Sequence, residues 1–480
     1  MSDTIKIHKM RQDIDDKYIG FRPQNTSVKP VHISGGAFRA LLGEAYNPSE
    51  LLRLSYVQSK KGKIVHSDET VYKELAERHL IDMEDVKLEE LRTFRSLLQA
   101  VVGADNGVFG KGMTTFSSAS KFFLTPDDLY QDAGEFIGSL ITVASPKLKA
   151  CTSDALNDTT DAISTLFLPV FNQEGGKKIE NKLEDLEVYT DGKLNDFIEQ
   201  VRMGGDCLAD NLELQPNKLI RLRQINFFTV LTLIRYLSVL EAIYCGGKVR
   251  PLLFDCSGDK SSSIAKASIN SVININQSVT RSYVWFFAQY LRKDYSKTEL
   301  LEMGTPVYEE NKKPTDKKSL DDRWSSAKQE AENLSEDECY MVFADALFDM
   351  LALEASSHPT NYIRALGTKS GVFYPPSNNV PNKRIIFSNE HIELLVKACV
   401  LNTEKPITMS DLLKRLWERF NIIIGGTMED AKHLSDAAIT QADEEALRQN
   451  KLYFERLLTS LSLAEIMADG LFQVKIGGLL

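Results

Sequence analysis

NKLIRLRQINFFTVLTLIRYLSVLEAIY, residues 217–244, is the stretch that most strongly determines the fold. Between Phe227 and Leu240 its apolar side chains point in nearly every direction around a helix of 3.6 residues per turn. A helix that is apolar on all sides either lies in a protein core or spans a membrane. The most apolar run, 227–234, ends at Arg235 and is well short of the ~20 residues that a span requires. We therefore predict a central core helix.

The chain around this core helix also carries mainly helical patterns. Apolar residues three and four positions apart predict helices over 87–102, 152–171, 264–291 and 339–355. Strand patterns are few and short, as in Leu252-Leu253-Phe254. Residues 1–49 carry turn signals such as Ser34-Gly35-Gly36 and are predicted to be irregular or weakly β. The predicted fold class is mainly α, a multi-domain helical body with small β elements.

The length of the chain predicts more than one domain. At 480 residues it exceeds the size at which a single hydrophobic core usually stops growing. The segment 304–338 is dense in both signs of charge and carries two prolines, which is typical of an exposed linker. We predict an N-terminal irregular and helical region (1–120), a central helical core domain (121–303), this charged linker (304–338) and a C-terminal helical domain (339–480).

Composition restricts the compartment and the partners. The chain has 57 Lys and Arg against 67 Asp and Glu, a formal charge of −10, so on average it repels nucleic acid. The six cysteines form no Cys-x-x-Cys pair, which indicates free thiols in a reducing compartment. The N-terminus lacks the apolar segment of a secretory signal. We expect a cytoplasmic protein without a membrane partner.

Two loops come near to a phosphate-binding pattern without meeting it. In 103–112, Asp105 occupies the first glycine position of a Walker loop, and Gly112 replaces the Ser or Thr that reaches Mg²⁺. The loop 257–261 contains Lys260 with no glycine directly before it, and Asp259 would repel phosphate. Histidines and carboxylates likewise lack the spacing of a local metal site. The sequence therefore indicates no catalytic, cofactor-binding or metal-ligating residues.

The C-terminal stretch 389–480 has a pattern that suggests a module. It reads helix, helix, short apolar strand, long helix and short apolar strand, and glycine pairs close both strands, Ile422–Gly426 and Phe472–Gly478. Winged-helix units, which bind DNA or dock proteins, use a similar order of elements. We predict a C-terminal winged-helix-like module.

The helix predicted over 410–420 carries the candidate contact residues of this module, Lys414, Arg415 and Arg419. Its spacing predicts one buried face, made by Leu413, Leu416, Trp417 and Phe420. The opposite face would expose Lys414, Arg415 and Glu418. Such basic residues would contact DNA or a partner protein, and an ordinary solvated helix face is the alternative.

The segment 409–476 resembles the C-terminal ends of large helical proteins encoded in bacterial phage-defence and DNA-modification islands. The resemblance lies in Leu416-Trp417-Glu418-Arg419-Phe420, the strand that follows it, the long helix 450–463 and Ala468-Asp469-Gly470 before the final strand. Those proteins accompany HerA/FtsK-type ATPases or methyltransferases. The resemblance implies an accessory or scaffolding role in a multi-protein antiviral system, and it supplies no site residues.

These observations lead to one principal functional prediction and two alternatives. The principal prediction is a non-enzymatic interaction or scaffolding subunit of a bacterial antiviral defence complex, which acts with an ATPase or nuclease partner. The first alternative is a DNA-binding regulator that contacts DNA through the C-terminal module. The second alternative is an enzyme whose site is assembled from residues far apart in the sequence.

Overall fold

The computed structural model describes the chain over residues 4–23, 28, 30–46, 66–79, 81–104, 121, 124, 132–158, 160, 176–308, 317–352, 358–377, 380–468 and 470–476. Some features of the sequence prediction lie partly outside these ranges, among them the glycine loop 103–112, beyond its first two residues, and the centre of the predicted linker, 309–316.

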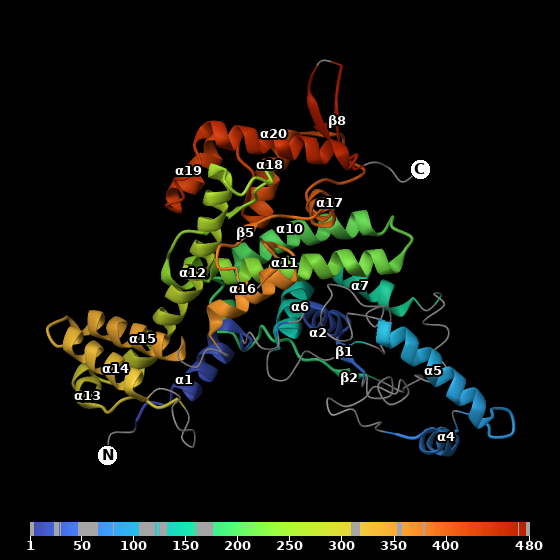
Figure 1. Cartoon of the computed structure of the whole chain (residues 1–480), viewed down its shortest axis with the longest axis horizontal. Helices are drawn as coiled ribbons and strands as arrows, with labels where there is room; N and C mark the ends of the chain where they lie inside the picture. Colours follow the sequence, from blue (N-terminus) through green and yellow to red (C-terminus); the bar gives the residue numbers. More distant parts are fainter. Residues whose placement is uncertain are drawn as a thin grey trace.

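The described part of the chain is mainly helical, as predicted (Figure 1). Its helices are α1 (Ile7–Ile14), the π-helical turn η1 (Asp15–Ile19), α2 (Pro30–Leu42), α4 (Asp68–Glu77), α5 (Leu88–Ala104), α6 (Ala133–Ala144), α7 (Pro146–Asn157), α9 (Glu187–Thr190), α10 (Asn195–Leu212), α11 (Lys218–Cys245), α12 (Ser263–Asp294), α13 (Lys297–Glu302), α14 (Lys317–Ala331), α15 (Glu336–Ala352), α16 (Pro359–Lys369), α17 (Asn389–Lys397), α18 (Met409–Phe420), α19 (Met428–Asp436) and α20 (Glu444–Ser460). Its strands are β1 (Glu44–Ala45), β2 (Lys177–Lys178), β3 (Leu252–Leu253), β4 (Phe373–Tyr374), β5 (Arg384–Ile385), β6 (Ile407–Thr408), β7 (Ile422–Ile423), β8 (Ala464–Ile466) and β9 (Phe472–Val474).

The predicted core helix is α11, and its position at the centre of the helical body is confirmed. It packs against α12 on one side and against α2, α6, α7, α16 and α17 on others. Among the described helices, α11 is long and apolar enough to cross a membrane, but 89% of its most apolar window is buried inside the protein. Its apolar surface is therefore already covered by neighbouring helices.

The helices α2 and α6 cross so closely that the glycines of α6 have no room for a side chain at the contact. A Cβ atom added at Gly134 would lie 2.3 Å from the carbonyl oxygen of Ile33, and one at Gly138 would lie 2.5 Å from that of Ala37.

The sequence prediction for residues 1–49 is wrong, because α1, η1 and α2 are helical there. Gly35 and Gly36 lie within α2 and not in a turn, and Gly36 belongs to this helix crossing, since a Cβ atom added there would lie 3.1 Å from the Cα atom of Gly134.

The predicted linker is also wrong where the structure describes it, since Lys317–Ala331 forms α14. Trp324 on this helix is 1% exposed, and its ring lies 4.7 Å from that of Phe343 on α15. The charged residues of α14 occupy the outward face of an amphipathic helix. That arrangement gives the same high charge density as a solvated linker, so composition alone did not distinguish the two.

Other predicted helices agree with the structure in position. The segments 87–102 and 264–291 correspond to α5 and α12, and 339–355 corresponds to α15. The segment 152–171 overlaps only the end of α7, which stops at Asn157, and 161–171 lies outside the described residues.

The strands are short and join distant parts of the chain. β3 of the body pairs in parallel with β7 of the C-terminal region, with Leu252 opposite Ile422. An isolated bridge between Phe254 and Ile385 adds β5, which pairs with β4. The predicted strand 422–424 therefore pairs with the helical body, through β7 and β3, and not with the other C-terminal strands.

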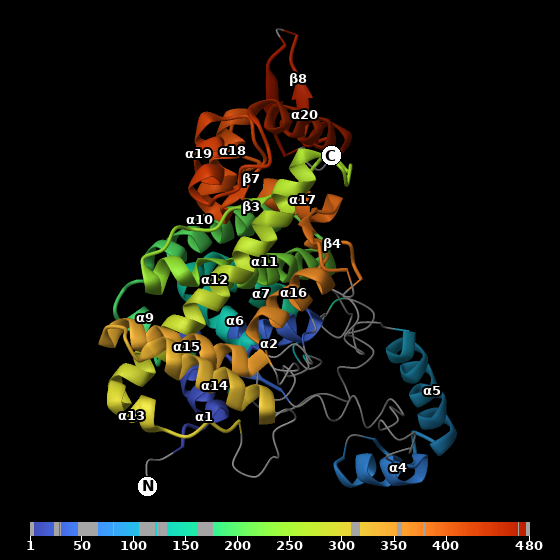
Figure 2. The same cartoon turned by 60° about the vertical axis from the view of Figure 1, so that its left-hand side comes forward.

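The C-terminal region builds a separate three-stranded antiparallel sheet with the order β6-β9-β8. Along the chain the elements run α17, β6, α18, β7, α19, α20, β8 and β9. α20 lies across the end of the molecule, and the hairpin of β8 and β9 extends beyond it (Figures 1 and 2).

One connected hydrophobic core contains residues from Ile5 to Val474. A smaller cluster also joins body and C-terminal region, since Leu253 and Ile264 pack there with Ile423 and Leu447. Residues from both sides of each predicted domain boundary, at 120, 303 and 338, thus belong to a shared core, and the division of the chain into folding units stays a prediction.

Candidate functional site

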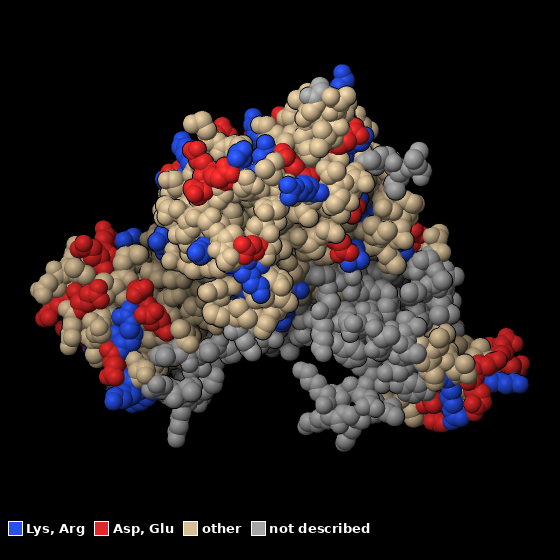
Figure 3. Space-filling view, turned by 45° about the horizontal axis from the view of Figure 1, so that its top comes forward, with Lys and Arg blue, Asp and Glu red and all other residues tan. Residues whose placement is uncertain are grey.

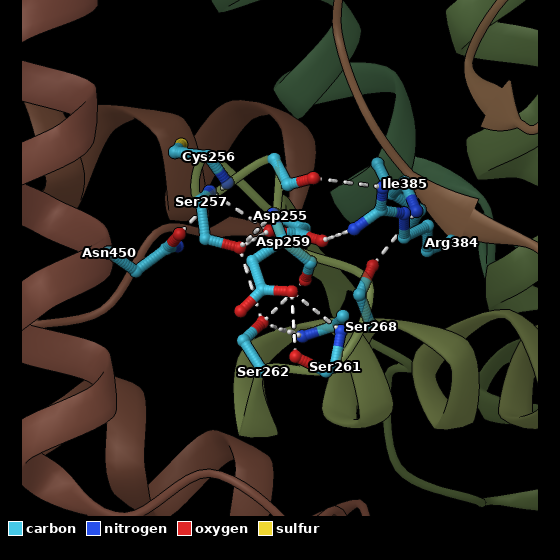
Figure 4. A network of polar contacts seen from close by, with 12 residues as sticks. Asp255, Cys256, Ser257, Asp259, Ser261, Ser262, Ser268, Arg384, Ile385 and Asn450 are labelled. Carbon is cyan, nitrogen blue, oxygen red and sulfur yellow. Dashed lines mark hydrogen bonds and ion pairs between the residues drawn. The ribbon is translucent and has the colours of Figure 1, made fainter.

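The loop between β3 and α12 has the strand–loop–helix arrangement that phosphate sites use, and its polar side chains form a network of hydrogen bonds (Figure 4). Ser262 begins α12 and accepts a hydrogen bond from the backbone N–H of Ala265 at 3.0 Å. The carboxylate of Asp259 accepts the backbone N–H of Ser261 at 2.8 Å. A bound phosphate would need this N–H group, which already donates to a carboxylate of the same loop.

Asp255 and Arg384 form a buried ion pair at the base of this loop. Arg384 Nη1 donates to Asp255 Oδ2 at 2.6 Å, and both side chains are buried. The other carboxylate oxygen of Asp255 accepts from the backbone N–H and the hydroxyl of Ser257, at 2.9 and 2.6 Å. A buried charge with this set of partners is compensated inside the protein, which is typical of a structural pair.

Asn450 on α20 connects the C-terminal region to both parallel strands. Its Nδ2 donates to the carbonyl oxygens of Phe254 and Ile424, at 2.8 and 2.7 Å. Its Oδ1 accepts the backbone N–H of Cys256 at 2.8 Å. These bonds satisfy the backbone groups that lie just beyond the ends of β3 and β7.

Cys256 follows Asp255 in this loop, and its thiol is the candidate nucleophile of the network. Burial raises the pKa of the Cys256 thiol well above its usual value, and the charge of Asp255 raises it further. A thiol held neutral in this way is a poor nucleophile. The network of Figure 4 therefore connects body and C-terminal region through bonds among its own polar groups.

The basic residues predicted to contact DNA or a partner have different environments. Arg415 donates through both terminal nitrogens to Glu404, at 2.7 and 3.1 Å, and also to the carbonyl oxygen of Cys399. Arg419 donates to the carbonyl oxygen of Ala398 at 2.6 Å. Both guanidinium groups therefore hold the chain that follows α17, and neither is a free surface cation.

Lys414 is the exposed member of the predicted trio, and its Nζ lies 3.8 Å from Glu418. The prediction for the rest of α18 is partly wrong. Leu413, Leu416 and Phe420 are buried, but Trp417 and Arg415 are only partly covered. The indole of Trp417 stacks on the ring of His433 with centroids 3.8 Å apart.

The surface of the C-terminal region is hollowed in places. One hollow, of about 750 Å³, lies between α18 and α19 and is lined by Trp417, Lys414 and His433, with Met428 91% exposed beside it. Another, of about 550 Å³, lies between α10, α17 and the end of α20 and includes Asn211. Asn211 already donates to the carbonyl oxygens of Lys397 and Val400.

The hairpin of β8 and β9 exposes apolar side chains that the sequence analysis did not single out. Ile466 is 67% exposed and Leu471 58%, and Met467 lies between them. The hairpin base carries an ion pair between Lys475 and Glu465. The alternation of side chains along β8 and β9 indicates which residues share a face of the sheet. Only the structure shows that the hairpin extends away from the body.

The outward face of α20 was also missed. Its inward positions are Leu447, Asn450, Phe454 and Leu458, all buried. On the opposite side Leu452 and Tyr453 are exposed, and the Arg456 guanidinium lies 5.6 Å from the centre of the Tyr453 ring. The signal was present in the sequence, since two large apolar residues interrupt the polar face of an amphipathic helix.

The surface charge of the C-terminal region is mixed. On the face drawn in Figure 3, basic and acidic side chains of the described residues alternate over this region. The helix α20 carries Arg448, Lys451 and Arg456 against Glu444, Glu445 and Glu455. Within the described ranges no group of three or more His, Cys, Asp or Glu residues is placed to hold a metal ion.

Comparison with known proteins adds no assignment. No protein family and no curated protein sequence matches the chain.

Proposed function

We propose that the protein is a non-enzymatic interaction subunit and that its C-terminal region, 389–476, is a winged-helix-like docking module. The order α17, β6, α18, α20, β8 and β9, with the sheet order β6-β9-β8, supports this proposal. Winged-helix units have three helices and a three-stranded sheet in that order. In this interpretation β7 and α19 are an insertion between the second and third helices, and the β8–β9 hairpin is the wing.

The observation that carries the proposal is the exposed apolar side chains of the hairpin. Ile466, Met467 and Leu471 lie on an element that extends beyond the body, and each is 40% exposed or more. Exposed apolar side chains that are clustered in this way mark interaction surfaces. A projecting hairpin would insert them into an apolar depression of a partner protein.

The charge of the module favours a protein partner over DNA. The helix that would enter a DNA groove, α20, has three acidic and three basic side chains, and two of the acidic ones lie in its first turn. DNA-binding faces carry an excess of Lys and Arg, because each phosphate contact replaces a condensed counterion. The resemblance of segment 409–476 supplies the proposed setting, a bacterial antiviral complex with an ATPase or nuclease as the partner.

The proposal is tested by binding measurements on hairpin variants. The chain is co-expressed with the proteins encoded by neighbouring genes, and any partner that copurifies is then purified and titrated against Met467→Ser combined with Leu471→Ser. We expect a loss of affinity of tenfold or more, as for exposed side chains that become buried at an interface. Met341→Ser on α15 is the matched control, because Met341 is 42% exposed and Met467 40%.

Two results would refute the docking role of the hairpin. One is partner binding that is equally strong in the hairpin variant and in the control. The other is tight duplex-DNA binding by the wild-type chain with a steep salt dependence, which would support the DNA-binding alternative.

A further inference from the structure

The outward face of α20 carries exposed side chains that are separate from those of the hairpin. Four buried side chains of this helix, Leu447, Asn450, Phe454 and Leu458, define its inward direction. At 100° per residue, Glu445, Gln449, Leu452 and Arg456 all lie within about 40° of the opposite direction. These four residues, together with Tyr453 beside them, are named here the outer stripe of α20.

The outer stripe has an acidic end, an apolar centre and a basic end. Glu445 lies in the first turn, Leu452 and Tyr453 in the middle, and Arg456 one turn further on. Among the described residues, no ion pair joins Arg456 to a carboxylate, and its guanidinium lies over the ring of Tyr453. Glu445 accepts hydrogen bonds from Arg448 and Gln449 of its own helix.

This order of charges is complementary to itself when two such helices run antiparallel. With a two-fold axis near residue 451, Glu445 of each chain faces Arg456 of the other, and Leu452 faces Gln449. The two contacts on either side of the axis are then identical, as an isologous interface requires. A parallel pairing would instead place each charge against its like and would be repelled.

We infer that the outer stripe of α20 pairs with the same stripe of a second copy of this chain, forming an antiparallel homodimer. The alternatives fit the stripe less well. DNA would be repelled by Glu444 and Glu445 in the first turn of α20, and an anionic membrane surface requires a basic face that α20 lacks. A single pair of crossing helices buries little area, so the dimer is weak, with a Kd of roughly 1–100 µM.

Sedimentation velocity over that concentration range tests the inference. The wild-type chain should move from one chain of 54.0 kDa toward twice that mass as concentration rises. Glu445→Arg and Arg456→Glu should each remain monomeric, because each places like charges opposite one another. An equimolar mixture of the two variants should recover the dimer, since both contacts then join opposite charges.

Glu444→Arg is the matched control for Glu445→Arg. It makes the same change of charge in the same turn of α20, but Glu444 lies off the outer stripe, so dimerisation should persist. Far-UV circular dichroism and a thermal melt of each variant establish that it is folded.

Three results would overturn the inference. The first is a wild-type chain that stays monomeric at ~200 µM, twice the upper end of the expected Kd range. The second is a dimer that both charge reversals leave intact. The third is a pair of folded, monomeric variants whose mixture does not associate. Loss of partner binding in the hairpin variant with an intact dimer would leave the inference standing, so the two proposals fail separately.

Discussion

The helices α18 and α20 of the C-terminal region are both amphipathic, yet their polar faces are used in opposite ways. On α18 the basic side chains Arg415 and Arg419 turn back to Glu404 and to backbone carbonyl groups of the protein. On α20 the outward residues Leu452, Tyr453 and Arg456 face solvent. Helical spacing gives the direction of a side chain but not what lies beside it, so spacing alone did not show that Arg415 and Arg419 have partners within the protein.

The inner and outer sides of α20 also differ, because the inner side contacts the rest of the protein and the outer side is exposed. Its inner side carries Asn450, whose hydrogen bonds join α20 to β3 and β7, and its outer side carries the stripe of exposed residues. Substitutions on the inner side should therefore change folding, and substitutions on the outer side should change association only.

The largest effect is expected on the inner side of α20. Asn450→Ala leaves the N–H of Cys256 and the carbonyl groups of Phe254 and Ile424 without their partner in a buried site. Because an unsatisfied buried polar group costs roughly 1–3 kcal/mol, the free energy of unfolding should fall by about 3 kcal/mol or more. Urea denaturation measures it, with Gln449→Ala on the outer side expected to stay within about ±0.5 kcal/mol. Equal effects of the two substitutions would contradict the comparison.

The next effect is a pH dependence of stability that comes from His391, a buried residue of α17. Burial lowers the pKa of His391 from 6.5 to about 4. Since the folded state prefers the neutral ring, the contribution of His391 to stability is complete above pH 6.5 and is lost as the pH falls toward 4. The loss reaches at most about 3 kcal/mol, from 1.36 kcal/mol per pKa unit.

His391→Gln should remove this contribution, so its stability should decline less than that of the wild type between pH 6.5 and 4. His358, whose pKa burial also lowers to about 4, remains in both proteins and cancels in the difference. Parallel stability curves for wild type and variant would show that His391 does not titrate in a buried site.

The smallest change in stability is expected on α18, where Arg415 is compared with Lys414. Arg415→Ala removes a partly buried bidentate pair with Glu404 and should lower the free energy of unfolding by ~1–2 kcal/mol. Lys414→Ala should change it by less than ~0.5 kcal/mol, because Lys414 is exposed and only near Glu418. If the two substitutions had equally small effects, Arg415 would be a surface cation as its spacing first suggested.

Part of this architecture could be read from the sequence because it depends on local spacing. The continuous apolar run of α11 and the apolar positions of α18, which repeat every three or four residues, are local patterns, so both helices and much of their burial were predictable. What failed depends on distant residues. The partners of Asn450 lie 194 or more residues away at Phe254 and Cys256, and no local pattern marks such a bond.

The errors in α2 and α14 have the same origin. Gly35 and Gly36 were interpreted as a turn because glycine favours turns, whereas α2 needs small residues where it crosses α6. The charges of α14 were interpreted as solvation of a linker, whereas Trp324 holds that helix against α15. In both cases the tertiary contact outweighed the local preference.

The central claim is that the helical body and the C-terminal region share one core and unfold together. The three tryptophans test it, since Trp285 lies on α12, Trp324 on α14 and Trp417 on α18. Each is retained alone by replacing the other two with Phe, and urea unfolding is followed by its fluorescence and by far-UV circular dichroism. We predict that within each variant the fluorescence and circular-dichroism midpoints coincide. A Trp417 transition clearly separated from the circular-dichroism transition would contradict the claim and favour an independent C-terminal domain.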